Sequence, residues 1–153
     1  MKIQIHPNLS SNSQNAVTLA KNKKFGEYRQ GKVIYSKYES LYLVETGKAE
    51  FAKKNPKIKK DEENNYLIFK DLRKKGYVVK TGVKFGAEFR IYENSKTSHA
   101  RWLVYIAEDK NKINLKDFIA KNRIAHSTGK KLLLAVIDSQ QDISYYEIGW
   151  IKI

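Results

Sequence analysis

The chain has 153 residues, enough for one domain of ordinary size or for two small ones. Thirty Lys and Arg residues against sixteen Asp and Glu residues give a formal net charge of +14, which favours a polyanionic partner, most simply a nucleic acid. Charge alone leaves open RNA, DNA, an anionic membrane surface, or a solvated basic surface without a partner. The absence of Cys excludes disulfides and thiolate metal sites. No apolar run is long enough to cross a bilayer and the first residues do not resemble a signal peptide, so we expect a cytoplasmic protein without a membrane partner.

The first third of the chain is polar and uneven, and it predicts a small α+β domain. Ser and Asn are frequent in residues 8–15, which favours a loop. Residues 32–36 (KVIYS) are typical of a short strand, and residues 38–46 (YESLYLVET) have the apolar spacing of a helix that Gly47 would end. Residues 53–63 (KKNPKIKKDEE) are almost all charged, which predicts a linker or a solvated loop.

The remainder of the chain predicts a second domain. Residues 65–75 place Tyr66, Phe69 and Leu72 on one face of a helix, and Gly76 follows as a stop. Strand-like segments rich in Val, Ile and aromatic residues then follow at 77–81, 84–92, 100–106, 131–138 and 143–153.

One more helix interrupts these strands, because Asn114 is a suitable N-cap for residues 115–121. Strands that alternate with helices in this way predict the α/β fold class. We therefore expect a small α+β N-terminal domain over residues 1–60, followed by a C-terminal α/β domain with a mixed sheet over residues 61–153.

The last predicted strand, 143–153, is apolar and runs to the final residue. At the edge of a sheet such a strand exposes unpaired backbone groups, so it is expected to be covered or to pair with another chain. We favour pairing across a subunit interface.

Three His residues are candidates for proton transfer near neutral pH, namely His6, His99 and His126. His99 has the most favourable context, because it follows a polar loop between two predicted strands. His126 is expected near the start of a strand, where a packed or capping role is more common. The chain shows no cluster of His and carboxylates at metal-ligand spacing, so no metal and no cofactor is expected. The two glycines of residues 82–86 (GVKFG) lack the spacing of a phosphate-binding loop and favour a bend between strands.

RNA can be cleaved without a metal if a base takes the 2′-OH proton, an acid protonates the leaving 5′-oxygen, and a cation balances the charge that develops at phosphorus. His, Tyr and Lys side chains can supply these three groups. Because such residues occur in most basic proteins, composition and pattern lead only as far as a basic protein that binds RNA.

The chain from Tyr66 onward is similar to the archaeal tRNA-intron endonuclease family. The resemblance rests on four stretches, which read YLIFKDLRKKGYVVKTGVKFGAEFRIYE, SHARWLVYI, RIAHSTGKKLLLAVID and DISYYEIGWIKI. The N-terminal third resembles the family only loosely, mainly through SLYLVETGKAEF, and is shorter than in the homotetrameric members. The fold that the resemblance implies for the C-terminal domain is the nuclease-like α/β fold of that family.

The resemblance implies a catalytic triad of Tyr92, His99 and Lys130. Tyr92 stands in the FRIYE motif, His99 in the triplet SHA, and Lys130 is the first of the two lysines before LLLAV. In the family these residues take the 2′-OH proton, protonate the leaving 5′-oxygen and stabilise the phosphorane. Strand alternation places only one of Lys130 and Lys131 on the face of the site, so Lys131 stays an alternative.

The activity that follows from the resemblance is that of a metal-independent endoribonuclease subunit. It cleaves precursor tRNA at bulge-helix-bulge exon–intron junctions and leaves 2′,3′-cyclic phosphate and 5′-hydroxyl ends. One alternative is a non-catalytic structural subunit that binds RNA in the same complex. Another is a DNA-binding nuclease-like module, which would usually require acidic metal ligands.

The resemblance also implies an RNA contact and an assembly. Arg123 corresponds to an Arg that stacks on a flipped-out bulge base, although it could instead contact phosphate alone. Family members dimerise through their C-terminal strands, and some form homotetramers by inserting an acidic loop into a neighbour. The corresponding loop here, 138–142 (DSQQD), is neutral in its middle. We therefore expect an α2β2 heterotetramer with a second endonuclease subunit.

Overall fold

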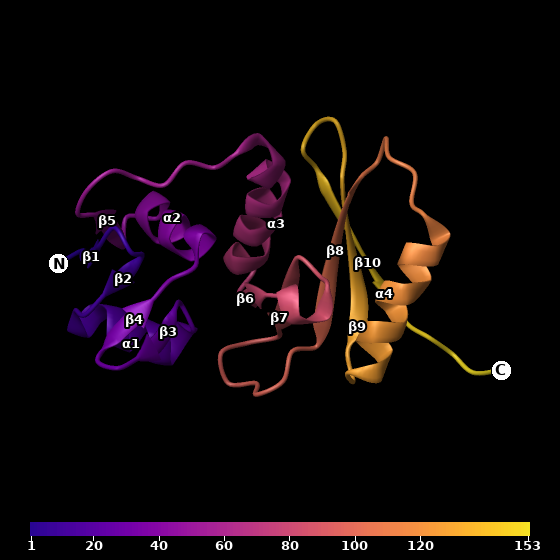
Figure 1. Cartoon of the computed structure of the whole chain (residues 1–153), viewed down its shortest axis with the longest axis horizontal. Coiled ribbons are helices and arrows are strands. Elements are labelled where there is room, and N and C mark those ends of the chain that lie inside the picture. The colour runs from indigo at the N-terminus through magenta and orange to yellow at the C-terminus, as the bar shows by residue number, and fades with distance from the viewer. The chain divides into compact units, whose positions relative to one another are not determined.

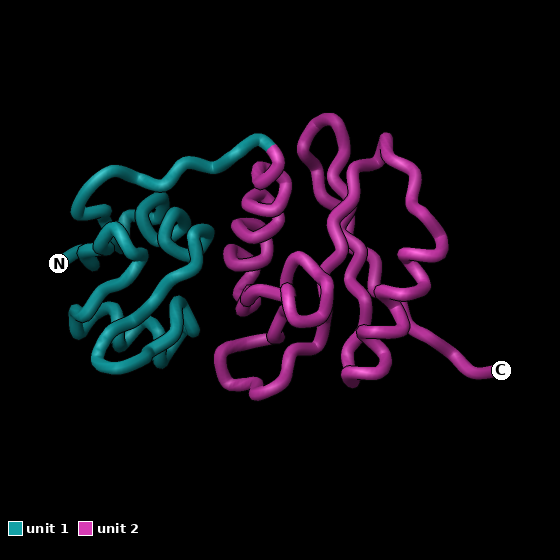
Figure 2. Tube along the Cα trace, in the orientation of Figure 1, with its two compact units in different colours: residues 1–60 teal, residues 61–153 magenta.

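The computed structural model describes residues 1–153, which form two compact units, Met1–Lys60 and Asp61–Ile153 (Figures 1 and 2). Each unit has its own sheets and helices and is described by itself. None of the helices is both long enough and apolar enough to span a bilayer.

Unit 1 packs two helices against two small sheets. Its elements are β1 (Ile3–Ile5), β2 (Ser10–Ser11), α1 (Gln14–Lys23), β3 (Glu27–Arg29), β4 (Lys32–Ile34), α2 (Lys37–Glu45) and β5 (Ala49–Phe51). Strands β1 and β5 pair in parallel, and β2, β4 and β3 form an antiparallel sheet in that order. The core contains the buried side chains of Ile5, Phe25, Val33, Tyr35 and Leu43.

Helix α2 begins where the sequence predicts a helix, because Ser36 and Glu39 form a capping box. The Ser36 hydroxyl accepts from the Glu39 backbone N–H, and the Glu39 carboxylate accepts from the Ser36 backbone N–H. Glu39 is buried, and it also accepts a hydrogen bond of 3.1 Å from the backbone of Gly26. Burial next to the Glu39 charge raises the pKa of Tyr35 to about 12. One carboxylate thus joins α2 to the turn before β3.

The loop predicted over residues 8–15 is wrong, since this stretch contains β2 and the start of α1. Ser13 is the N-cap of α1, and its hydroxyl accepts from the backbone N–H of Ala16. Only Ala16 and Ala20 are buried along α1, so the apolar periodicity is weak. The Ser and Asn residues therefore mark a helix start, although the same residue types also favour loops.

Unit 2 contains a five-stranded mixed sheet. Its elements are η1 (Lys60–Glu62), α3 (Glu63–Lys74), β6 (Val78–Thr81), η2 (Val83–Phe85), β7 (Phe89–Tyr92), β8 (Trp102–Glu108), α4 (Leu115–Ser127), β9 (Lys131–Ile137) and β10 (Ile143–Ile148). The strand order is β10-β9-β8-β7-β6. Strands β8 and β9 are parallel and joined through α4, and the other neighbours are antiparallel. The α/β fold class is confirmed.

Helices α3 and α4 cover opposite faces of this sheet (Figure 1). On one face Phe69 of α3 contacts Phe89 of β7, with ring centroids 6.0 Å apart. On the other face the buried Ala125 of α4 packs with Leu103 and Leu132, which lie on the central strands. Alternation along each strand therefore assigns every side chain to the α3 face or the α4 face.

Several boundaries in unit 2 differ from the predicted ones, three of them by five residues or more. The predicted strand 84–92 begins as the 3₁₀ turn η2 and pairs only from Phe89. The predicted helix 115–121 extends to Ser127, because burial of Ala125 continues its packing. The last strand stops at Ile148, which lies opposite Leu132, one residue from the start of β9 at Lys131, so β9 offers no partner to most of residues 149–153.

Candidate active site

Three strand ends meet at one end of the unit 2 sheet. Ile91 of β7 lies opposite Trp102 of β8, and Trp102 lies opposite Lys131 of β9. Strand β7 runs antiparallel to β8, whereas β9 runs parallel to it, so the end of β7 and the starts of β8 and β9 coincide. Tyr92 and Lys130 flank this end, and their backbones are two strand spacings or about 10 Å apart.

Tyr92 and Lys130 both belong to the α4 face. On β7 the buried Phe89 and Ile91 point to the α3 face, so Arg90 and Tyr92 point to the other. The Arg90 guanidinium lies 5.9 Å from the centre of the Tyr92 ring. Two half-buried cationic and aromatic side chains of β7 thus lie on the face that α4 covers.

Lys130 directly precedes β9 and turns toward the same face. Its Nζ donates a hydrogen bond of 3.0 Å to the backbone oxygen of Thr128 and lies 4.7 Å from the centre of the Phe85 ring. Phe85 itself packs with Leu103 and Ala125 on the α4 face. Lys130 is therefore a half-buried cation at the end of the sheet.

Lys131 points the other way. Its Nζ donates to Oε1 of Glu147 at 3.2 Å, and Trp102 Nε1 donates to Oε2 of the same carboxylate at 2.6 Å. The Trp102 hydrogen bond, together with Lys131 and Arg101, lowers the pKa of Glu147. Lys131 is thus engaged in an ion pair on the α3 face, which favours Lys130 over its neighbour as the site lysine.

His99 lies in the exposed loop between β7 and β8. Asn94 holds this loop, because its side-chain oxygen accepts from the backbone N–H groups of Lys96 and Thr97. Arg101 closes the base of the loop through an ion pair with Glu93, and its backbone N–H donates to Ile91 at 2.8 Å. His99 therefore lies in a loop whose two ends are joined next to Tyr92 by contacts of Arg101 with Glu93 and Ile91.

A cavity of about 510 Å³ opens at this end of the sheet. Its lining includes Arg101, Asn122, His126, Lys130, Lys131 and Trp150. The lining contains three cations and no carboxylate, although Arg101 and Lys131 also pair with Glu147 outside the lining. The excess of positive charge favours an anionic group in the cavity. Sequence reasoning did not identify Arg101, Asn122 or Trp150 as parts of a site; the exposed Trp near the chain end was the one signal that pointed there.

Helix α4 carries the two other residues that the sequence suggested. Arg123 is exposed near the end of the helix and lies seven residues before Lys130. The prediction that His126 lies near the start of a strand is wrong, because His126 occupies the last turn of α4. Its ring packs on Trp150, with centroids 4.4 Å apart, which agrees with the packed role expected for it. The third His, His6, belongs to unit 1 and is exposed.

Tyr92 at the end of β7, the loop that carries His99, and Lys130 before β9 thus belong to the same end of the sheet, although they come from three separate segments. A phenol, an imidazole and an ammonium group are able to serve as base, acid and cation in a phosphoryl transfer. No three His, Asp or Glu side chains lie together in an arrangement that could hold a metal ion.

Comparison with known proteins shows the family to which the chain belongs. Residues 63–145, more than half of the chain, match the family described as tRNA intron endonuclease, catalytic C-terminal domain. The chain is 36% identical over 155 aligned residues to the tRNA-splicing endonuclease of Thermococcus kodakarensis, with 93% of this chain and 92% of that protein covered.

Two other relatives, both described as tRNA-splicing endonucleases, give similar values. That of Methanothermobacter thermautotrophicus is 36% identical, with 84% of this chain and 83% of that protein covered. That of Methanococcus maripaludis is 31% identical, with 92% and 88% covered. The similarity therefore extends into unit 1, beyond the stretches that carried the resemblance. The chain belongs to the tRNA intron endonuclease family and carries its catalytic domain.

Proposed function

We propose that this chain is a metal-independent endoribonuclease subunit that cleaves precursor tRNA at bulge-helix-bulge exon–intron junctions. The observation that supports the proposal is that β7, β8 and β9 end together, so that Tyr92, the loop with His99, and Lys130 belong to the same end of the sheet, where Lys130 also lines a cavity. The name of these relatives, tRNA-splicing endonuclease, supports precursor tRNA as the substrate.

In the proposed reaction Tyr92 acts as the phenolate, and its oxygen takes the proton of the 2′-OH next to the scissile phosphate. The 2′-oxygen then bonds to phosphorus, and the bond from phosphorus to the 5′-oxygen breaks. His99 gives its proton to that 5′-oxygen. The products are a 2′,3′-cyclic phosphate and a 5′-hydroxyl, and no water or redox partner is consumed.

Lys130 has an electrostatic role in this proposal. The phosphorane carries one more negative charge than the starting diester, and a positioned ammonium group stabilises that charge more than the ground state. The Thr128 carbonyl and the Phe85 ring hold Nζ at the end of the sheet before RNA binds. Arg123, exposed on α4, is proposed to contact the RNA at the bulge, by stacking on a base or by pairing with phosphate.

We further propose that the chain works in an α2β2 assembly with a second endonuclease subunit. Strand β10 is an edge of the five-stranded sheet, and Tyr146, Trp150 and Ile151 are exposed on and after it. Such an edge can be covered by the same strand of another subunit. The turn 138–142 is short and closed on itself, because Asp138 accepts from the backbone N–H groups of Gln140 and Asp142. A turn of this kind has little length to insert into a neighbour.

The test is cleavage of a bulge-helix-bulge precursor tRNA in EDTA, by the chain alone and together with a candidate partner subunit. Cleavage that leaves a cyclic phosphate and is lost in His99→Ala supports the proposal. RNA binding without cleavage under every pairing would instead indicate a structural subunit. A fully active homotetramer of the chain alone, measured by light scattering, would contradict the α2β2 assembly.

A further inference from the structure

The positive charge of the chain is concentrated in unit 1 and not in the unit that carries the candidate active site. Residues 1–60 contain thirteen Lys and Arg residues, four Glu and no Asp, which gives a formal charge of +9. Residues 61–153 contain seventeen basic and twelve acidic residues, a formal charge of only +5. The smaller unit therefore holds most of the charge that attracts a polyanion.

The few acidic residues of unit 1 do little to offset this charge at its surface. Glu39 is buried, where it caps α2 and binds the backbone of Gly26. Glu27 forms an ion pair with Arg29. Four glutamates against thirteen basic residues leave unit 1 with its large positive formal charge.

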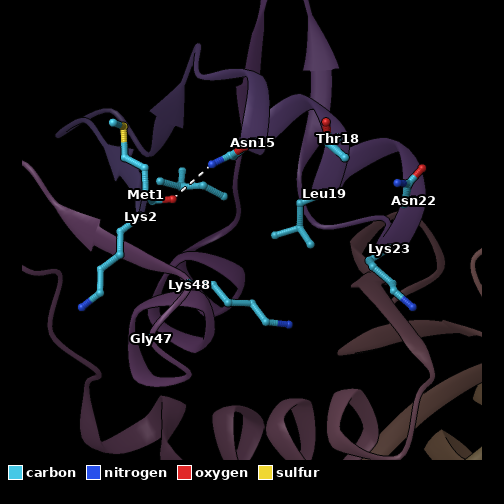
Figure 3. A pocket seen from close by; sticks show the side chains of 10 residues that line it. Met1, Lys2, Asn15, Thr18, Leu19, Asn22, Lys23, Gly47 and Lys48 are labelled. Atoms are coloured by element: carbon cyan, nitrogen blue, oxygen red, sulfur yellow. Dashed lines mark hydrogen bonds between the residues drawn. The ribbon is translucent and has the colours of Figure 1, made fainter.

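Unit 1 also has a hollow that collects part of this charge. The hollow has a volume of about 600 Å³ and lies between the chain start, one side of α1 and the turn after α2 (Figure 3). Lys2, Lys23 and Lys48 come to it from these three places, and no carboxylate lines it. Three cations from separate segments around one hollow form a local maximum of positive potential.

The remaining lining suits a nucleotide chain. Asn15, Thr18 and Asn22 follow one another along one side of α1 at helical spacing and line the same hollow, and the Thr18 hydroxyl donates to the backbone oxygen of Gln14. Asn15 already donates to the backbone oxygen of Met1 at 3.1 Å, which fixes the chain start beside α1. Leu19 points into the hollow and offers an apolar surface (Figure 3). Amide, hydroxyl and apolar groups between lysines can accommodate phosphates together with the sugars that join them.

We propose that this hollow of unit 1 is a second RNA-binding surface, which holds the phosphodiester backbone of the substrate through Lys2, Lys23 and Lys48. The inference rests on the proposed function, because it takes the substrate RNA as the polyanion. Backbone contacts of this type supply affinity and register without reading sequence. The surface therefore acts on substrate binding and not on the chemical step.

The test compares two triple variants of the full chain, each made in a His99→Ala background so that the RNA stays intact. One carries Lys2→Gln, Lys23→Gln and Lys48→Gln. The matched control carries Lys53→Gln, Lys54→Gln and Lys57→Gln, which removes the same charge from the same unit but outside the hollow. Binding of a bulge-helix-bulge RNA is followed by fluorescence anisotropy at salt concentrations between about 50 and 200 mM. Each phosphate contact contributes about 0.7–0.9 to the slope of log K against log salt concentration.

The hollow variant is expected to lose about 2–3 units of the slope of log K against log salt, and on the order of 10²-fold in affinity near 0.1 M salt. The control variant is expected to change the salt slope and the RNA affinity much less. With His99 restored, the hollow variant should raise KM and leave kcat unchanged. Equal affinity and slope in the two variants would overturn the inference. Unchanged RNA binding with a loss of assembly in light scattering would also overturn it, and would assign the hollow to an acidic protein surface.

This outcome is separable from the proposed function. If the unmodified chain cleaves the RNA while the hollow variant binds like the control, the second surface is wrong and the endonuclease stands. If the unmodified chain binds the RNA but does not cleave it, either alone or with any partner subunit, the proposed endonuclease activity is wrong. The comparison of the two variants still reports on RNA binding by the hollow.

Discussion

Trp102 of β8 lies directly opposite Lys131 of β9, and both side chains bind the carboxylate of Glu147 on the α3 face. Because side chains alternate along a strand, this pairing sends Lys130 to the α4 face, which it shares with Tyr92. A relation between two residues that take no part in the proposed chemistry thus decides which of two adjacent lysines faces the candidate site.

The two lysines should therefore respond very differently to substitution. Lys130→Ala is expected to lower kcat by roughly 10²–10³-fold, as loss of one group that stabilises transition-state charge usually does. Lys131→Ala removes the same charge and the same number of atoms, but it breaks the ion pair with Glu147 and should leave kcat nearly unchanged, with any effect on RNA binding confined to KM because Lys131 also lines the cavity. Single-turnover cleavage at saturating enzyme separates the two, and a larger loss in Lys131→Ala would reverse the assignment.

Arg101 is expected to position His99 without touching the reacting atoms. It pairs with Glu93 next to Tyr92 and lies 3.8 Å from Glu147, so it joins both ends of the His99 loop to the sheet. A small displacement of a catalytic group can cost about 10²-fold, so Arg101→Ala should lower kcat by about 10–10²-fold.

A matched control for Arg101 is available at the other end of β8. Lys110→Ala breaks the exposed ion pair with Glu108, of 3.1 Å, and should leave kcat unchanged. Because Arg101 also lines the cavity, the variant's KM is measured separately from kcat. If Arg101→Ala raises KM alone, Arg101 binds RNA and does not position the loop.

Tyr145 is expected to anchor α3 to the sheet. Its hydroxyl donates a hydrogen bond of 2.6 Å to Asp71, and burial together with this bond raises its pKa, so the phenol stays protonated and able to donate. Tyr145→Phe should lower the free energy of unfolding by about 1.5 kcal/mol, the lower range for a bond to a charged group. The neighbouring Tyr146 is exposed, and Tyr146→Phe should change the free energy of unfolding by less than about 0.5 kcal/mol. Urea unfolding at one protein concentration measures both, and equal effects would contradict the anchor.

Stability should depend on pH through Glu147. The Trp102 hydrogen bond and the nearby cations hold its folded-state pKa below the ordinary value of 4.5, so its contribution is present above that value and is lost as the pH falls through the lowered pKa. The side chain is 37% exposed, and the contribution at neutral pH is therefore expected to be small, about 0.5 kcal/mol.

The matched comparison is Glu147→Gln, which keeps an acceptor for Trp102 but has no charge. Thermal unfolding of the two proteins between pH 7 and pH 3 should show the parent more stable at the upper end, with the difference disappearing as Glu147 becomes protonated. A difference that stays constant across this range would show that packing, and not the charge, is responsible.

Most helices and strands of unit 2 could be predicted from local sequence, because helix caps and apolar strand patterns depend on residues within a single turn or strand. The Asn114 side chain accepts from the backbone of Asp117, as an N-cap does, and the apolar run from Leu132 to Ile137 forms most of β9, as a buried strand would. The family resemblance named Tyr92, His99 and Lys130 from their motifs alone. Helix α1 escaped prediction because two buried Ala residues leave almost no periodic pattern.

The sequence by itself determined the helices with strong caps, the buried strands, the basic charge and the residue types of the candidate site. Only the tertiary structure decided that β7, β8 and β9 end together, that Lys130 and not Lys131 shares a face with Tyr92, and that Lys2, Lys23 and Lys48 surround one hollow. The reason is physical: capping and strand propensity depend on neighbours a few residues apart. Strand order and register depend on the packing of side chains that are distant in the sequence, and no local pattern records those contacts.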